Sequence, residues 1–178
     1  MRWLRFALCV ITLLSIFMPS TGAQSKKDPL NEDEVDQVRE FGDRPNERIK
    51  LFAKFIEQRI TVIKQLSTDK RAENRSAELR AKFEEFTRLA DELQDNLDTY
   101  DQEHADIRKA LKDLVPESEK WEPALNLFGP DSGYDFARKT AVEAARSVTD
   151  QLKDLQKDQE KYFAEHKDQA GKNGTGPQ

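Results

Sequence analysis

The sequence contains two histidines, His104 and His166, and these residues most readily suggest chemistry. Imidazoles bind metals and haem, and Asp101 lies three residues before His104, on the same face of a helix. A di-iron bundle, however, needs a Glu-x-x-His motif on each of two helices, whereas Phe163 stands three residues before His166. A c-type haem would need a Cys-x-x-Cys-His motif, which is absent from the sequence. We therefore expect both histidines to be ordinary packing residues, and we expect no metal and no cofactor.

A run of carboxylates over residues 89–107 is the second candidate, because it contains seven acids and no Lys or Arg. It lacks the Asp-x-Asp-x-Asp-Gly loop of calcium sites, and carboxylates on a helix point outward rather than toward one ion. The pair Glu84 and Glu85 is likewise expected on the surface rather than as a general acid and base. No Gly-x-Ser-x-Gly elbow, P-loop or dinucleotide-binding loop is present. The sequence therefore predicts no catalytic residues and no enzyme.

The first 23 residues have the composition of a secretory signal peptide. Two arginines precede an apolar run over residues 6–18, and small residues follow, with cleavage expected between Ala23 and Gln24. The run is too short to cross ~30 Å of hydrocarbon at ~1.5 Å per residue, although an uncleaved anchor is the alternative. We therefore expect an exported protein, periplasmic or secreted, with no membrane partner after cleavage.

Charge and cysteine content limit the partners of the mature chain. The sequence has 29 Lys or Arg against 34 Asp or Glu, a net charge of −5, and cleavage would remove two of the bases. Cleavage would also remove Cys9, the one cysteine, so that the mature chain could form no disulfide and would offer no thiolate. An acidic chain without a basic run is a poor match for nucleic acid, and no nucleic-acid partner is expected.

The elements that must position these residues are expected to be helices. No Gly or Pro occurs between Pro45 and Pro116, which favours helix throughout that stretch. After a flexible segment at residues 24–30, a first helix is predicted at about residues 32–41, with Asn31 as its N-cap in a capping box with Glu34. A second helix is predicted from Pro45 to about residue 66, and its wide apolar stripe indicates more than one neighbour.

The third segment carries the clearest pattern, an unbroken 4-3 spacing of apolar side chains typical of a coiled coil. It predicts one long helix over residues 76–115, whose seam at residues 79–114 would be about 54 Å long. The register does not continue back into the second helix, so a turn is predicted within residues 67–76, with one continuous rod as the alternative. The seam residues are Leu79, Phe83, Phe86, Ala90, Leu93, Leu97, Tyr100, His104, Ile107, Leu111 and Leu114.

A connector rich in proline follows over residues 116–130, with a short helical turn expected around Trp121. We expect Trp121 to close one end of the bundle, and the alternative is that it belongs to an exposed patch for a partner. A fourth helix is predicted from residue 131 or 132 to about residue 170. Residues 171–178 are rich in glycine and are expected to form a disordered tail.

The lengths of these helices predict an all-α fold, with a single helical bundle domain at residues 31–170. The expected form is an elongated antiparallel bundle or coiled-coil hairpin of three long staves, the first split into two helices. Phe83 and Phe86 would then lie opposite Tyr162 and Phe163, and the two histidines would lie near opposite ends. In outline the chain resembles the small exported helical proteins of bacterial envelopes, including coiled-coil periplasmic chaperones, through its signal peptide and long heptad helices.

These observations lead to one main functional hypothesis, a non-enzymatic exported protein that binds another macromolecule, such as a protein partner. The alternative is a carrier of a small ligand or metal, with a pocket lined by Tyr100, His104 and the Ala-rich start of the fourth helix. Heptad seams also pair between chains, so a homodimer through the seam is a further alternative.

Overall fold

The computed structural model describes residues 28–69 and 73–172, and within these residues it is an all-helical bundle. The expected signal peptide, its cleavage site at Ala23 and Gln24, and the tail beyond residue 172 lie outside the described residues. Within the described part, no helix has the length and apolar character that a membrane span requires. The helices are α1 (Glu32–Glu40), α2 (Pro45–Thr68), α3 (Arg75–Gln102), α4 (Arg108–Ser118), α5 (Trp121–Leu125) and α6 (Asp135–Glu165).

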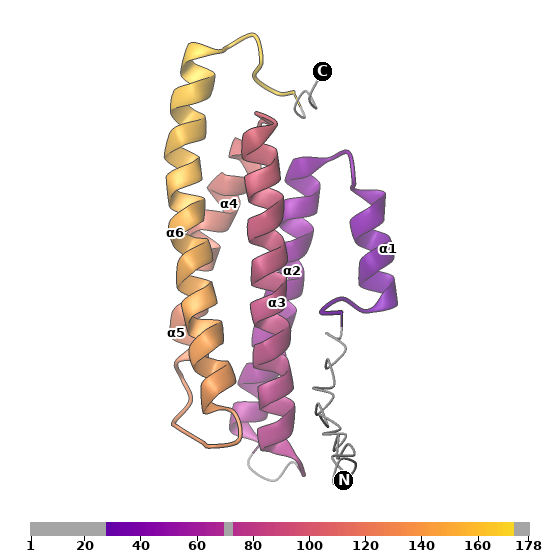
Figure 1. Cartoon of the computed structure of the whole chain (residues 1–178), viewed down its shortest axis with the longest axis vertical. Coiled ribbons are helices and arrows are strands. Elements are labelled where there is room, and N and C mark those ends of the chain that lie inside the picture. The colour runs from indigo at the N-terminus through magenta and orange to yellow at the C-terminus, as the bar shows by residue number, and fades with distance from the viewer. Residues whose placement is uncertain (1–27, 70–72, 173–178) are drawn as a thin grey trace, which may run out of the picture.

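Four staves form the bundle, namely α2, α3, α6 and the consecutive pair α4 and α5 (Figure 1). α2 and α3 run antiparallel, whereas α3 and α6 run parallel and pack along each other. α4 and α5 complete the ring, because they contact both α6 and α2. The core lies between the staves, and its largest fully buried side chains include Trp121, Phe52, Phe55, Phe83 and Phe86.

The first two helices begin as their local sequence predicts. The Asn31 side chain accepts the Glu34 N–H at 2.9 Å, and the Glu34 carboxylate accepts the Asn31 N–H at 2.9 Å, which confirms the capping box. Pro45 is the first residue of α2. The helix ends at Thr68 and α3 begins at Arg75, so the predicted turn is confirmed and the continuous rod is wrong.

The predicted single helix over residues 76–115 is also wrong, because α3 ends at Gln102 and the chain reverses before α4. α3 ends in a Schellman motif, in which the Ala105 N–H bonds the Tyr100 carbonyl at 2.9 Å and the His104 N–H bonds that of Asp101 at 3.0 Å. His104 takes the left-handed conformation that this motif requires, with φ of 52°. Histidine tolerates that conformation better than a bulky or β-branched residue.

The corner at residues 103–107 is held by a side chain that is distant in sequence. Gln159 on α6 is buried, and its amide oxygen accepts the Ile107 N–H at 3.1 Å while its amide nitrogen donates to the Ala105 carbonyl at 2.9 Å. These bonds replace the ones that a continuous helix would have given the same backbone groups. The corner therefore depends on tertiary contacts that no local pattern reveals.

Two further contacts fix the same corner from α2 and from the end of the chain. Asn46 donates to the Asp106 carbonyl at 2.8 Å and accepts the Ala110 N–H at 2.9 Å. The Asp106 carboxylate accepts the Gly171 N–H at 2.7 Å, and the Asp106 N–H donates to the Lys172 carbonyl at 3.0 Å. Residues 171 and 172, expected within the tail, are thus bonded to the bundle.

The corner changes the number of staves and the partners within the core. The predicted seam residues are buried on both sides of it, except His104, which is exposed. They line one core from α3 and α4 rather than from one rod, so there are four staves instead of three. α6 also begins later and ends earlier than predicted, at Asp135 and Glu165.

The aromatic partners differ from the prediction for the same reason. Phe83 packs against Phe128 and Tyr134, with ring centroids 5.6 and 5.9 Å apart, and Phe86 packs edge-on against Trp121 at 6.2 Å. Trp121 is fully buried, and its indole N–H donates to Glu57 at 2.5 Å. The alternative of an exposed patch at Trp121 is therefore wrong.

Candidate functional site

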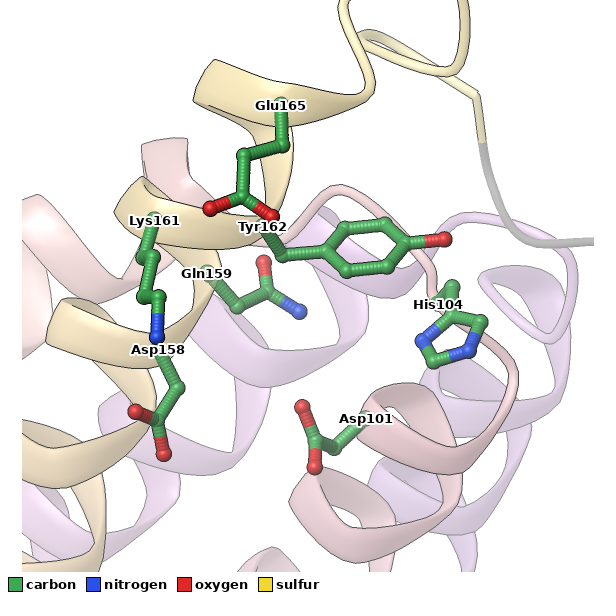
Figure 2. A pocket seen from close by; sticks show the side chains of 7 residues that line it. All are labelled: Asp101, His104, Asp158, Gln159, Lys161, Tyr162 and Glu165. Carbon is green, nitrogen blue, oxygen red and sulfur yellow. The ribbon is translucent and has the colours of Figure 1, made fainter.

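An open pocket of about 300 Å³ lies between the C-terminal ends of α3 and α6 (Figure 2). Three of its side chains are carboxylates and one is a lysine, so the lining is negatively charged. In Figure 2 the Asp101 carboxylate points toward the space between the two helices. The lining residues are Asp101, His104, Asp158, Gln159, Lys161, Tyr162 and Glu165.

Two helix ends bring these residues together. Asp101 lies in the last turn of α3, and His104 follows it in the Schellman motif. Asp158, Lys161, Tyr162 and Glu165 are spaced three or four residues apart on α6, which places them along one face of that helix. The parallel packing of α3 and α6 makes the two C-terminal ends meet (Figure 1).

Both histidines lie beside one tyrosine in this region. The Tyr162 ring stacks on the His104 ring at 4.5 Å and on the His166 ring at 4.2 Å, with interplanar angles of 19° and 18°. The Tyr162 hydroxyl donates to Gln169 at 2.8 Å. The expectation that the histidines lie near opposite ends of the bundle is therefore wrong, because the extra stave makes α3 and α6 parallel.

The Asp101 carboxylate lies in an electrostatically unfavourable part of the pocket. Although Asp101 is exposed as a residue, partial desolvation of its carboxyl in the pocket raises its pKa, the negative charges of Asp158 and Asp98 raise the pKa further, and His104 lowers it. A cation placed between Asp101 and Asp158 would relieve this repulsion. Among the described residues, however, no group of three or more His, Cys, Asp or Glu side chains is arranged to hold a metal ion.

The small-ligand hypothesis named a different lining. Tyr100 is only 6% exposed and belongs to the core, and the pocket takes its residues from the end of α6 rather than from its Ala-rich start. His104 is the one residue of the expected lining that reaches the pocket. Asp158 and Tyr162 were missed because their position beside α3 depends on the parallel packing, which the heptad pattern did not indicate.

A second cluster of charges lies where α1 meets α2 and α3. The Arg59 side chain is only 10% exposed, and its guanidinium donates to both carboxylate oxygens of Glu34, at 2.6 and 2.7 Å. The same guanidinium donates to Glu85 at 3.1 Å and to the Pro29 carbonyl at 2.8 Å. The sequence signal for this cluster is Arg59 itself, a charged residue that interrupts the wide apolar stripe of the predicted second helix.

The pKa values of this ion pair show how tightly its charges are held. Burial by itself would raise the pKa of Glu34, but hydrogen bonds from Arg59 and the Asn31 amide, with the charges of Arg59 and Lys82, lower it below its ordinary value of 4.5. The hydrogen bond to Glu34 raises the pKa of Arg59. Both groups are therefore charged at neutral pH, and neither can lose its partner without cost.

The third candidate is an apolar surface at the junction of α5 and α6, defined by Leu127 and Phe136. Phe136 is 85% exposed and Leu127 is 70% exposed, and these are the exposed large hydrophobic side chains of the described residues. Arg138 donates to the Asn126 side chain at 3.1 Å, which ties the connector to the first turn of α6. The connector that carries Leu127 and the helical turn that carries Phe136 are therefore held together.

The structure thus offers three places where a ligand or partner could bind: the acidic pocket, the Arg59 cluster and the apolar surface of Leu127 and Phe136. Each suits a different chemistry, namely a cation, a carboxylate and an apolar side chain. No family model, curated protein or solved structure matches this chain.

Proposed function

We propose that this protein is an exported, non-enzymatic helical bundle that acts by binding another protein in the periplasm or outside the cell. The observation that carries the proposal is the exposure of Phe136, together with that of Leu127 in the connector just before α6. A phenylalanine side chain gains about 2 kcal/mol when it is fully buried. Large aromatic side chains at protein interfaces are frequent sources of binding energy.

The exposed setting of the acidic pocket supports a role without catalysis. Asp101, His104, Asp158 and Glu165 all lie open to solvent. Catalytic carboxylates and imidazoles usually act in enclosed sites, where exclusion of water strengthens their electrostatic effects. We infer that these residues are a binding surface rather than acid and base catalysts.

The packing also bears on oligomeric state and on the coiled-coil prediction. We infer that α2 and α3 pack as an elongated antiparallel hairpin with heptad geometry and serve as a rigid scaffold for the binding surfaces. The heptad residues of this scaffold are buried within one chain. A homodimer through the seam would require the bundle to open, so we propose a monomer.

The proposal is tested by capture of partners from the host's envelope fraction with the mature protein as bait. We expect Phe136→Ser to reduce the captured protein at least tenfold, because it removes the apolar side chain from the interface. Lys157→Ser is the matched control, since Lys157 is also exposed on α6. Equal capture by both variants and the wild-type chain, at equal melting temperatures, would show that Phe136 is not part of an interface.

A second candidate function is the binding of a small organic cation in the acidic pocket. Asp101 and Asp158 line the same pocket from α3 and α6, which favours this function, because an ammonium group there would offset two carboxylates at once. A linear diamine added to the wild-type protein should raise its melting temperature, and Asp101→Asn should abolish the rise. Absence of any shift with diamines, amino acids or divalent cations would exclude this function.

A further inference from the structure

α1 is an appendage of the bundle rather than one of its staves. It lies outside α2, on the side away from α6 (Figure 1). Its backbone packs closely against α2, and Glu34 and Val38 are its buried residues. Leu30 and Phe41, just beyond its two ends, are partly buried against the core. A helix with so few buried side chains is held by a small number of contacts, among which the Glu34–Arg59 ion pair is the most enclosed.

The face of α2 beneath α1 is apolar, with one cation in it. Leu51, Phe55, Arg59 and Val62 follow one another at intervals of three or four residues, which places them along a single face of the helix. α1 and α2 run antiparallel (Figure 1), so the Glu34–Arg59 contact brings Val38 level with Phe55. We call α1 the arm, and we call this face of α2, with Lys82 and Glu85 of α3 at its edge, the arm-binding face.

α1 does not fill the space on this face completely. An open cleft of about 450 Å³ lies beside the ion pair, and it is lined by residues on both sides of the contact, among them Leu30, Glu34, Arg59, Val62, Lys82 and Glu85. The cleft gives solvent, and a competing segment, access to the edge of the contact. The edge of the ion pair is therefore reachable from the N-terminal end of α1 while the four staves stay packed.

The charges of the arm-binding face select a carboxylate. Glu85 also accepts two hydrogen bonds from Lys82, at 2.8 and 2.9 Å, so it is shared between two cations. Without Glu34, the Glu85 carboxylate alone would face both Arg59 and Lys82, and the arm-binding face would carry an unbalanced positive charge. A guanidinium held in this way binds a carboxylate through two parallel hydrogen bonds, as it binds Glu34.

We propose that α1 is a displaceable arm, and that the arm-binding face takes up an acidic amphipathic helix of a partner protein in its place. Such a helix carries a carboxylate at the position of Glu34 and an aliphatic residue four positions later, at the position of Val38. α1 is the template for this occupant, because it already satisfies both requirements. The inference rests on the proposal that the protein binds another protein, and it adds a surface separate from Leu127 and Phe136.

The release of the arm is tested by hydrogen exchange in the full chain. We expect Glu34→Gln to accelerate exchange of the amides in residues 32–40 at least tenfold, while the amides of α2 to α6 keep their protection. Glu32→Gln is the matched control, because Glu32 is an exposed acid of the same turn and does not contact Arg59 in the hydrogen bonds described. Unchanged exchange in α1, or loss of protection throughout the chain, would overturn the proposal.

Recognition by the arm-binding face is tested with a fluorescent peptide of residues 28–43. The peptide should bind the full-length Glu34→Gln chain at least tenfold more tightly than the wild-type chain, whose own arm competes. A peptide with Glu34→Gln should bind that chain at least tenfold more weakly than the unmodified peptide, whereas a peptide with Glu32→Gln should bind within threefold of it. These peptide changes leave the folded chain untouched, so a loss of binding cannot come from misfolding.

Three results would overturn the inference. The first is equal binding of all three peptides, and the second is no binding of any. The third is a dimer of the Glu34→Gln chain in light scattering that the unmodified peptide dissociates, because the occupant would then be a second copy. If the host capture experiment fails but the peptide binds as expected, the proposed function is rejected and the arm-binding face is retained. If capture succeeds but the peptide does not bind as expected, only the displaceable arm is rejected.

Discussion

Gln159 is a buried polar side chain whose amide oxygen and nitrogen are both bonded to the backbone of the corner. Arg59 has a comparable role where α1 docks, since its guanidinium bonds a carboxylate from each of two other helices. In both cases one side chain satisfies polar groups that burial would otherwise leave unpaired. Single residues of this kind decide where the chain turns and which elements touch.

The role of Gln159 predicts a large effect of Gln159→Leu. The change leaves the Ile107 N–H and the Ala105 carbonyl without their partners, at about 1–3 kcal/mol for each buried group. We expect urea denaturation to show a loss of about 2–4 kcal/mol in the free energy of unfolding. Gln102→Leu, at an exposed position, should change it by less than about 0.5 kcal/mol. Equal effects of the two substitutions would show that the corner does not depend on Gln159.

The ion pair of Glu34 predicts a dependence of stability on pH. Because the pKa of Glu34 is lower in the folded chain than its ordinary value of 4.5, the pair stabilises the fold above that pH and is lost as the pH falls through the folded-state pKa. At pH 7, Glu34→Gln should reduce the free energy of unfolding by about 1–3 kcal/mol, since release of α1 limits the cost of breaking the pair. Denaturation at pH 3 should show a smaller difference. A difference that grows on acidification would contradict this sign.

At the scale of elements, the predictable features are those that a few neighbouring residues determine. The capping box of Asn31 and Glu34 and the start at Pro45 are encoded locally, and the helices begin there. The corner after Gln102 is not, because the partner that stabilises it, Gln159, is distant in sequence. Heptad spacing continues from Leu97 to Leu111 because both are buried in one core, and burial alone does not require a shared helix. The acidic pocket was missed for the same reason.

The backbone conformation at the corner also predicts which of two substitutions at His104 gives the more stable protein. His104 has a left-handed backbone, which glycine adopts freely and which costs other residues roughly 1 kcal/mol. His104→Gly should therefore be more stable than His104→Ala by about 1 kcal/mol in urea denaturation. In an unbroken helix the order would be reversed by about the same amount, because glycine weakens a helix interior. The measured order thus distinguishes the corner from the rod.

At the scale of the whole molecule, the four-stave bundle buries the predicted seam residues other than His104 and leaves the acidic pocket, Leu127 and Phe136 exposed to solvent. The chain should therefore be monomeric, because the seam that would join two chains is already used within one. Size-exclusion chromatography with light scattering should give the mass of one chain at all concentrations. A stable dimer would show that an outer surface, rather than the seam, joins two copies.

The central claim, that the apolar surface around Phe136 binds another protein, is tested most directly by crosslinking in the intact host. A photoreactive phenylalanine analogue is placed at residue 136, and a matched chain carries it at residue 157 on the same helix. The account predicts a discrete crosslinked protein species from residue 136 and none from residue 157. Identical patterns from the two positions, or no crosslinked protein from residue 136, would contradict this claim.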